Sequence, residues 1–88
     1  MQIPPLKEMV SSLIAAPSVS STLPQFDQSN LDVVHFLANW LTPLGFHVDI
    51  QSITDRPGKA NIIATLGDGR DGLLLSGHTD TVPFDTHL

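Results

Sequence analysis

The sequence predicts an α/β fold, as the N-terminal part of a three-layer α/β/α domain. Apolar residues recur with a helical period near 3.6 up to Gly45, and they alternate with a period of two after it. The run Leu73–Leu75 follows a glycine-rich segment, a pattern that is typical of a central strand buried on both faces. The expected order is therefore helix, helix, strand, strand, strand.

The first helix is predicted over residues 5–16. Pro5 suits its opening turn, where a missing N–H costs nothing, and Pro17 ends it. Five apolar residues form one stripe along this helix: Leu6, Met9, Val10, Leu13 and Ile14. The Ser-, Thr- and Pro-rich residues 17–28 are predicted to be a loop.

The second helix is predicted over residues 31–44, with Ser29 or Asn30 as its cap. Apolar residues fill most of its circumference, which indicates burial on more than one side, and Trp40 is expected in the core. Pro43 is expected to tighten or kink the last turn.

Strands are predicted near residues 46–53, 60–66 and 72–77, joined by a turn at Pro57–Gly58 and a hairpin at 67–72. Because the partners of a central strand are missing from these 88 residues, the three leucines and the second helix are expected to leave apolar surface uncovered.

Composition excludes several classes of function. The formal net charge is −5, and the four basic residues are dispersed, so a nucleic-acid partner is not expected. The absence of cysteine excludes disulfides and thiolate metal sites. The sequence has neither a signal peptide nor 18 consecutive apolar residues, so we expect a cytoplasmic protein without a membrane span.

The segment Ser76–Pro83 carries the chemistry. It follows the predicted central strand, and ligands of open α/β sheets bind just outside the carboxyl ends of such strands. Alternation places His78 and Asp80 on the same side of an extended chain. A metal-binding imidazole commonly donates its other N–H to a carboxylate, which His-x-Asp supplies locally. The tripeptide alone is more often a histidine that is salt-bridged to a carboxylate in a loop.

This octet, after Gly72–Leu75, resembles the first metal-binding motif of the M20 metallopeptidase family. Softer matches resemble the bacterial members that deacetylate N-acetylornithine: Asp27–Asn30, Leu37–Trp40, Leu44–Phe46 and Thr81–Asp85. The resemblance covers the chain from the first helix to about Asp85.

The resemblance implies a cytoplasmic, homodimeric enzyme of arginine biosynthesis. Such an enzyme hydrolyses a small N-acylated amino acid, N-acetyl-L-ornithine, to L-ornithine and acetate with two zinc or cobalt ions. His78 would ligate one metal ion, and Asp80 would be the active-site carboxylate that supports it. The family's other ligands and its general base lie further along than this chain. Residues 1–88 are therefore expected to be an incomplete portion of the metallohydrolase catalytic domain, inactive alone.

Two alternatives remain open. The chain can belong to another M20 member, such as a succinyl-diaminopimelate desuccinylase or a dipeptidase. It can also be non-catalytic, as a truncated product or a module that folds against a partner. Of the other histidines, His35 and His47 are expected to be solvated surface residues, and His87 is not expected to join a site with His78 and Asp85.

Overall fold

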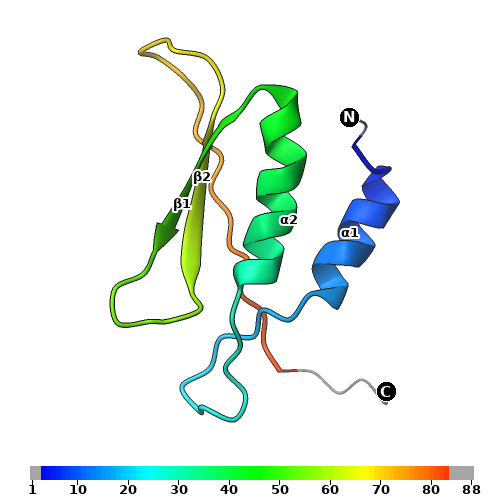
Figure 1. Cartoon of the computed structure of the whole chain (residues 1–88), viewed down its shortest axis with the longest axis vertical. Coiled ribbons are helices and arrows are strands. Elements are labelled where there is room, and N and C mark those ends of the chain that lie inside the picture. The colour runs from blue at the N-terminus through cyan, green and yellow to red at the C-terminus, as the bar shows by residue number, and fades with distance from the viewer. Residues whose placement is uncertain (1–2, 84–88) are drawn as a thin grey trace.

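The computed structural model describes residues 3–83. Its elements are, in order, the helices α1 (Leu6–Ala15) and α2 (Leu31–Leu41), the 3-10 helix η1 (Thr42–Leu44), and the strands β1 (His47–Ser52) and β2 (Ala60–Thr65). The strands form a two-stranded antiparallel sheet. In Figure 1, α2 lies between this sheet and α1. The predicted mixture of helices followed by strands is therefore confirmed.

The core lies around the N-terminal half of α2. Val33 and Val34 are 4% and 0% exposed, and they are joined in the core by Val19 from the loop after α1 and by Ala60 at the start of β2. The stripe of α1 is less well covered, with Leu6 and Ile14 exposed by 73% and 71%. Both helices are thus present close to their predicted bounds, but only α2 is anchored in a core.

The end of α2 follows from local chemistry. The Thr42 hydroxyl donates to the Ala38 carbonyl at 2.8 Å, and Pro43 lies in η1, so the last predicted turn is tightened as expected. Gly45 has a φ of 95°, and its N–H donates to the Thr42 carbonyl at 3.1 Å. This left-handed position suits glycine, which has no Cβ to clash with the following carbonyl.

Alternation along the strands gives the sheet one covered and one solvated face. Val48 pairs with Ala64, and Ile50 pairs with Ile62. Ala60 on the same face is buried, and Val48, Ile62 and Ala64 are half-buried. The intervening residues of both strands are exposed. The predicted period of two is therefore confirmed along β2, whereas on β1 only Val48 is half-buried and Ile50, on the same face, is 40% exposed.

The third predicted strand, at residues 72–77, is not formed. Leu73, Leu74 and Leu75 are 86%, 87% and 85% exposed, and the segment runs past β2 without joining the sheet (Figure 1). A strand needs a hydrogen-bonded neighbour, and within residues 3–83 the sheet contains only β1 and β2. The hairpin predicted at 67–72 is wrong for the same reason, because it leads into no strand.

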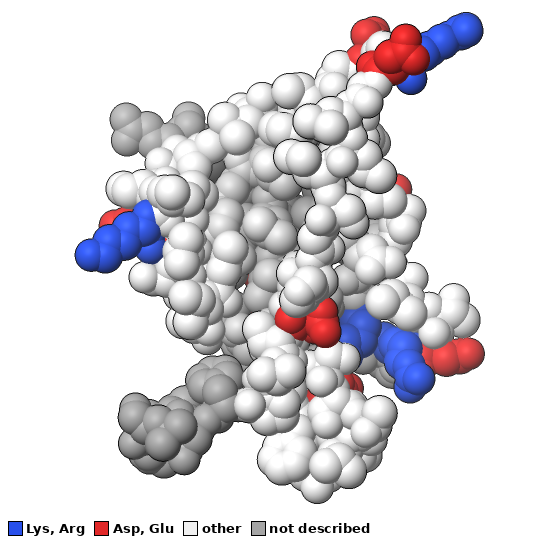
Figure 2. All heavy atoms as spheres, turned by 180° about the vertical axis from the view of Figure 1, so that it is seen from behind, with Lys and Arg blue, Asp and Glu red and all other residues white. Residues whose placement is uncertain are grey.

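The expected uncovered apolar surface is confirmed for these leucines. On α2 it is confined to part of the helix, where Phe36 is 36% exposed and stacks on Trp40 with ring centroids 5.6 Å apart. Figure 2 shows a largely uncharged face with a few charged side chains, mostly near its edges. Between residues 3 and 83, neither helix is long and apolar enough to cross a membrane.

Candidate metal-binding site

His78 and Asp80 form a close pair. The distance from His78 Nδ1 to Asp80 Oδ1 is 2.9 Å, and the Asp80 backbone carbonyl oxygen lies 3.1 Å from the same nitrogen. Their side chains are 81% and 59% exposed. The predicted contact between imidazole and carboxylate is therefore confirmed, although it sits in an irregular segment and not at the end of a strand.

The pair fixes the tautomer of a neutral His78. Both partners of Nδ1 are oxygens that only accept, so Nδ1 must carry the proton. The lone pair of the neutral ring then lies on Nε2, which is the arrangement that a metal-binding histidine needs. A histidine without such acceptors beside Nδ1 has no such constraint on its tautomer.

The pair lines a wide concavity of about 1140 Å³. One wall is the segment from Leu74 to Asp80, and another is β2 with the residues that precede it. Ser18, Ser20 and Asn30 contribute from the loop after α1 and the start of α2. The concavity is open to solvent, which agrees with the high exposure of His78.

The loop after α1 holds the segment that carries the pair. Thr81 donates its N–H to the Ser18 carbonyl at 3.1 Å and accepts at its own carbonyl from the Ser20 N–H, also at 3.1 Å. These bonds make an isolated parallel bridge between Val19 and Thr81. Ser18 and Val19 are buried, so the anchor belongs to the core.

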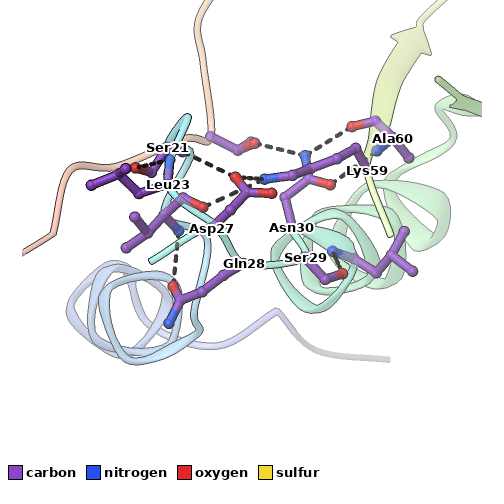
Figure 3. Close-up of polar contacts among 11 residues, drawn as sticks. Ser21, Leu23, Asp27, Gln28, Ser29, Asn30, Lys59 and Ala60 are labelled. Carbon is purple, nitrogen blue, oxygen red and sulfur yellow. Dashed lines mark hydrogen bonds and ion pairs between the residues drawn. The ribbon is translucent and has the colours of Figure 1, made fainter. Parts of the chain in front are cut away.

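The loop is itself braced by polar side chains (Figure 3). Gln28 accepts at Oε1 from the Val19 N–H at 2.9 Å. Asp27 accepts from the Ser21 N–H and pairs with Lys59 Nζ, both at 3.0 Å. The Ser21 hydrogen bond, followed by that of Lys59, lowers the pKa of Asp27 below its ordinary 3.8.

A second brace comes from Asn30. Its Nδ2 donates to the Ala60 carbonyl at 2.8 Å and to Thr79 Oγ1 at 3.2 Å, and its Oδ1 accepts from the Ala60 N–H at 2.9 Å (Figure 3). Ser29 or Asn30 was predicted as the helix cap, and the side chain of Asn30 makes no capping bond. Ser29 does so instead, since its Oγ accepts from the Leu31 N–H at 3.1 Å.

The donor set fits one metal ligand and its supporting carboxylate. Within residues 3–83, no group of three or more His, Cys, Asp or Glu side chains is placed to hold a metal ion. His35 lies on α2 and His47 on β1, and both are exposed, as predicted for solvated residues. His87 and Asp85 lie outside the described residues.

The sequence did not predict the hydrogen bond from Asn30 Nδ2 to the Thr79 hydroxyl. The two residues are 49 positions apart. Asn30 lies where an N-cap is expected, so capping was the role that its position predicted. Only the position of Thr79, inside the motif, gave a signal.

Comparison with known proteins identifies the kind of chain. No family model matches it. It is 50% identical over 88 residues to the acetylornithine deacetylase of Photorhabdus laumondii, 52% over 85 residues to that of Proteus mirabilis, and 51% over 84 residues to that of Pasteurella multocida. These alignments cover 96–100% of the chain but only 22–23% of each relative. The resemblance inferred from the sequence is therefore confirmed: over essentially all its residues, the chain is similar to a segment of acetylornithine deacetylases.

Proposed function

We propose that the chain is the N-terminal part of a metal-dependent amide hydrolase that converts N-acetyl-L-ornithine to L-ornithine and acetate. We call the chain continued to the length of its relatives the full-length enzyme. We infer for it a three-layer α/β/α catalytic domain, two zinc or cobalt ions, a homodimeric state, and a cytoplasmic place in arginine biosynthesis.

One observation carries the proposal, namely the 2.9 Å contact of His78 Nδ1 with Asp80. It leaves Nε2 of the neutral ring as an electron-pair donor beside a wide concavity. About 50% identity to acetylornithine deacetylases along the whole chain favours this substrate over those of a desuccinylase or a dipeptidase.

The proposed roles of the two residues differ. His78 binds a metal ion through Nε2, and Asp80 holds the ring in the required tautomer and orientation through Nδ1. When bound, the metal pair supplies polarisation of the amide carbonyl and a water of lowered pKa. Asp80 thus acts on the reaction through the position and basicity of His78.

The test compares His78→Ala and Asp80→Asn in the full-length enzyme. His78→Ala should lower both metal content per protomer and turnover, because a direct ligand is lost. Asp80→Asn should weaken metal affinity or activity by about 10–100-fold, as is typical when the carboxylate behind a ligating histidine is removed. His35→Ala, on the exposed face of α2, serves as the control and should leave metal content unchanged.

The alternative of a purely structural pair makes the opposite prediction. It requires a lower melting temperature in both variants with metal content intact. Full metal occupancy and near-normal turnover in His78→Ala would end the assignment of His78 as a ligand.

The 88-residue chain by itself should not hydrolyse N-acetylornithine, even with added zinc or cobalt. A catalytic zinc ion takes about three protein ligands and a water molecule. The described residues bring together one histidine and one carboxylate. Metal-dependent turnover by the purified chain, measured by release of ornithine, would contradict this expectation.

A further inference from the structure

The side-chain amide of Asn30 uses both its donors and its acceptor on two segments of the chain. The Ala60 N–H can only donate, so the atom that faces it must be Oδ1, which fixes the orientation of the amide. Nδ2 then has two hydrogens, one for the Ala60 carbonyl and one for the Thr79 hydroxyl. Asn30 thus pairs with both the N–H and the carbonyl of Ala60, the first residue of β2, as the backbone of a neighbouring strand would.

Asn30 is held firmly enough to act as an anchor. Its backbone N–H donates to the Gly58 carbonyl at 3.1 Å, and its carbonyl accepts from the Val34 N–H at 3.0 Å. Ala60 is 3% exposed and Val34 is fully buried. The amide therefore projects from a fixed part of the core.

Thr79 lies between the two residues of the candidate site. Thr79 is half-buried and faces Asn30, whereas the side chains of His78 and Asp80 are 81% and 59% exposed. This is the alternation of side chains along an extended chain. A bond that holds Thr79 inward therefore turns its neighbours outward together.

We propose that Asn30 is a positioning residue for the His78–Asp80 pair, which it orients by fixing the hydroxyl of Thr79 against the start of β2. The bridge at Thr81 fixes the segment on the C-terminal side of the pair, and Asn30 fixes it between the pair's two members. This inference rests on the proposed role of His78 as a metal ligand. Its consequence is that metal affinity depends on an amide whose hydrogen bonds go to Ala60 and Thr79.

The experiment uses three variants of the full-length enzyme. Thr79→Val removes the hydroxyl at nearly constant volume, Thr79→Ser keeps it, and Asn30→Ala removes the amide. Zinc dissociation constants are measured by competition with a chelator, together with kcat, KM and melting temperature. Thr79→Val and Asn30→Ala should each weaken zinc binding about tenfold, the lower bound for residues that orient a ligating histidine.

Thr79→Ser should bind zinc like the unaltered enzyme, because its hydroxyl still accepts from Asn30. A fourth variant that combines Thr79→Val with Asn30→Ala should bind zinc no more weakly than the weaker of the two single variants, since both substitutions remove the same contact. Ser29→Ala is the matched control for stability: it loses the hydrogen bond from the Leu31 N–H to Ser29 Oγ and leaves the hydrogen bonds of Asn30 with Ala60 and Thr79 in place. It should lower the melting temperature without changing zinc affinity.

The outcomes separate the two proposals. If His78→Ala loses zinc while Thr79→Val and Asn30→Ala keep full affinity, the positioning role is wrong and the ligand assignment stands. If His78→Ala also keeps its zinc, the ligand assignment has failed. If Asn30→Ala does not fold, the Thr79→Val and Thr79→Ser pair still decides. If Ser29→Ala and Asn30→Ala weaken zinc binding by the same factor, the loss comes from lower stability, and Asn30 has only a structural role.

Discussion

Asp27 shows how single polar residues hold the surroundings of the candidate site. It joins the loop after α1 to Lys59, the residue before β2, and that loop in turn holds Thr81. The Lys59 ammonium also lies 3.4 Å from the Val19 carbonyl, on the residue that bridges to Thr81. The Asp27–Lys59 ion pair thus stabilises the loop that is bridged to Thr81, next to His78 and Asp80.

The contribution of Asp27 to stability should depend on pH. Its pKa is lowered in the folded chain, chiefly by the Ser21 hydrogen bond, so folding favours the ionised form. The stabilisation is present above the ordinary pKa of 3.8 and is lost as the pH falls through the lowered folded value. Asp27→Asn should therefore be less stable than the unaltered chain at pH 7, and the difference should shrink below about pH 3.8.

Urea denaturation at pH 7 and at pH 3 measures both stabilities. Asp49→Asn, on the solvated face of β1, is the control and should change stability little at pH 7. A difference between Asp27→Asn and the unaltered chain that is the same at both pH values would show that charge is not its cause.

At this scale, the sequence predicts what is local. The His78–Asp80 contact joins residues two positions apart, and alternation is sufficient to foresee it. The contact of Asn30 with Thr79 depends on how α2, β2 and the last segment come together. No local pattern in the sequence encodes that arrangement, so Asn30 was expected only to cap a helix.

Among the elements, the β1–β2 hairpin depends on Gly58. Its φ is 82°, and a Cβ there would lie 3.3 Å from Ser29 Cβ. Gly58→Ala should therefore be destabilising through both backbone strain and this contact. The backbone part alone is about 1–2 kcal/mol for a non-glycine residue in the left-handed region.

Gly67→Ala separates the two effects. Gly67 has nearly the same φ, 83°, but a Cβ there would have nothing within 4 Å. Denaturation should show a smaller loss of stability for Gly67→Ala than for Gly58→Ala, by the amount that the Ser29 contact adds. Equal losses would show that Ser29 moves aside freely.

The strands also show where prediction from sequence stops. β1 and β2 are adjacent along the chain, and a short turn joins them, so each has its partner within reach. Residues 72–77 have the composition of a central strand, but a strand forms only beside another strand. The apolar pattern therefore predicted a strand that residues 72–77 do not form.

For the whole molecule, the exposed leucines and the small share of each relative that the chain covers both indicate that Leu73–Leu75 have packing partners outside this chain. Three consecutive leucines at 85–87% exposure are unusual on a finished surface. The chain spans only 22–23% of the length of the relatives that it matches. We therefore expect residues of the full-length enzyme outside this chain to cover Leu73–Leu75.

Leu74→Ala tests this in two lengths of protein. In the 88-residue chain, where Leu74 is 87% exposed, the variant should change the free energy of unfolding by less than about 0.5 kcal/mol. In the full-length enzyme it should cost about 2–5 kcal/mol, the usual loss for a buried leucine. Val34→Ala is the control, because Val34 is 0% exposed already and its loss should destabilise both lengths. A cost for Leu74→Ala in the full-length enzyme as small as in the chain would mean that the leucines stay in solvent, and that residues 72–77 do not become a central strand.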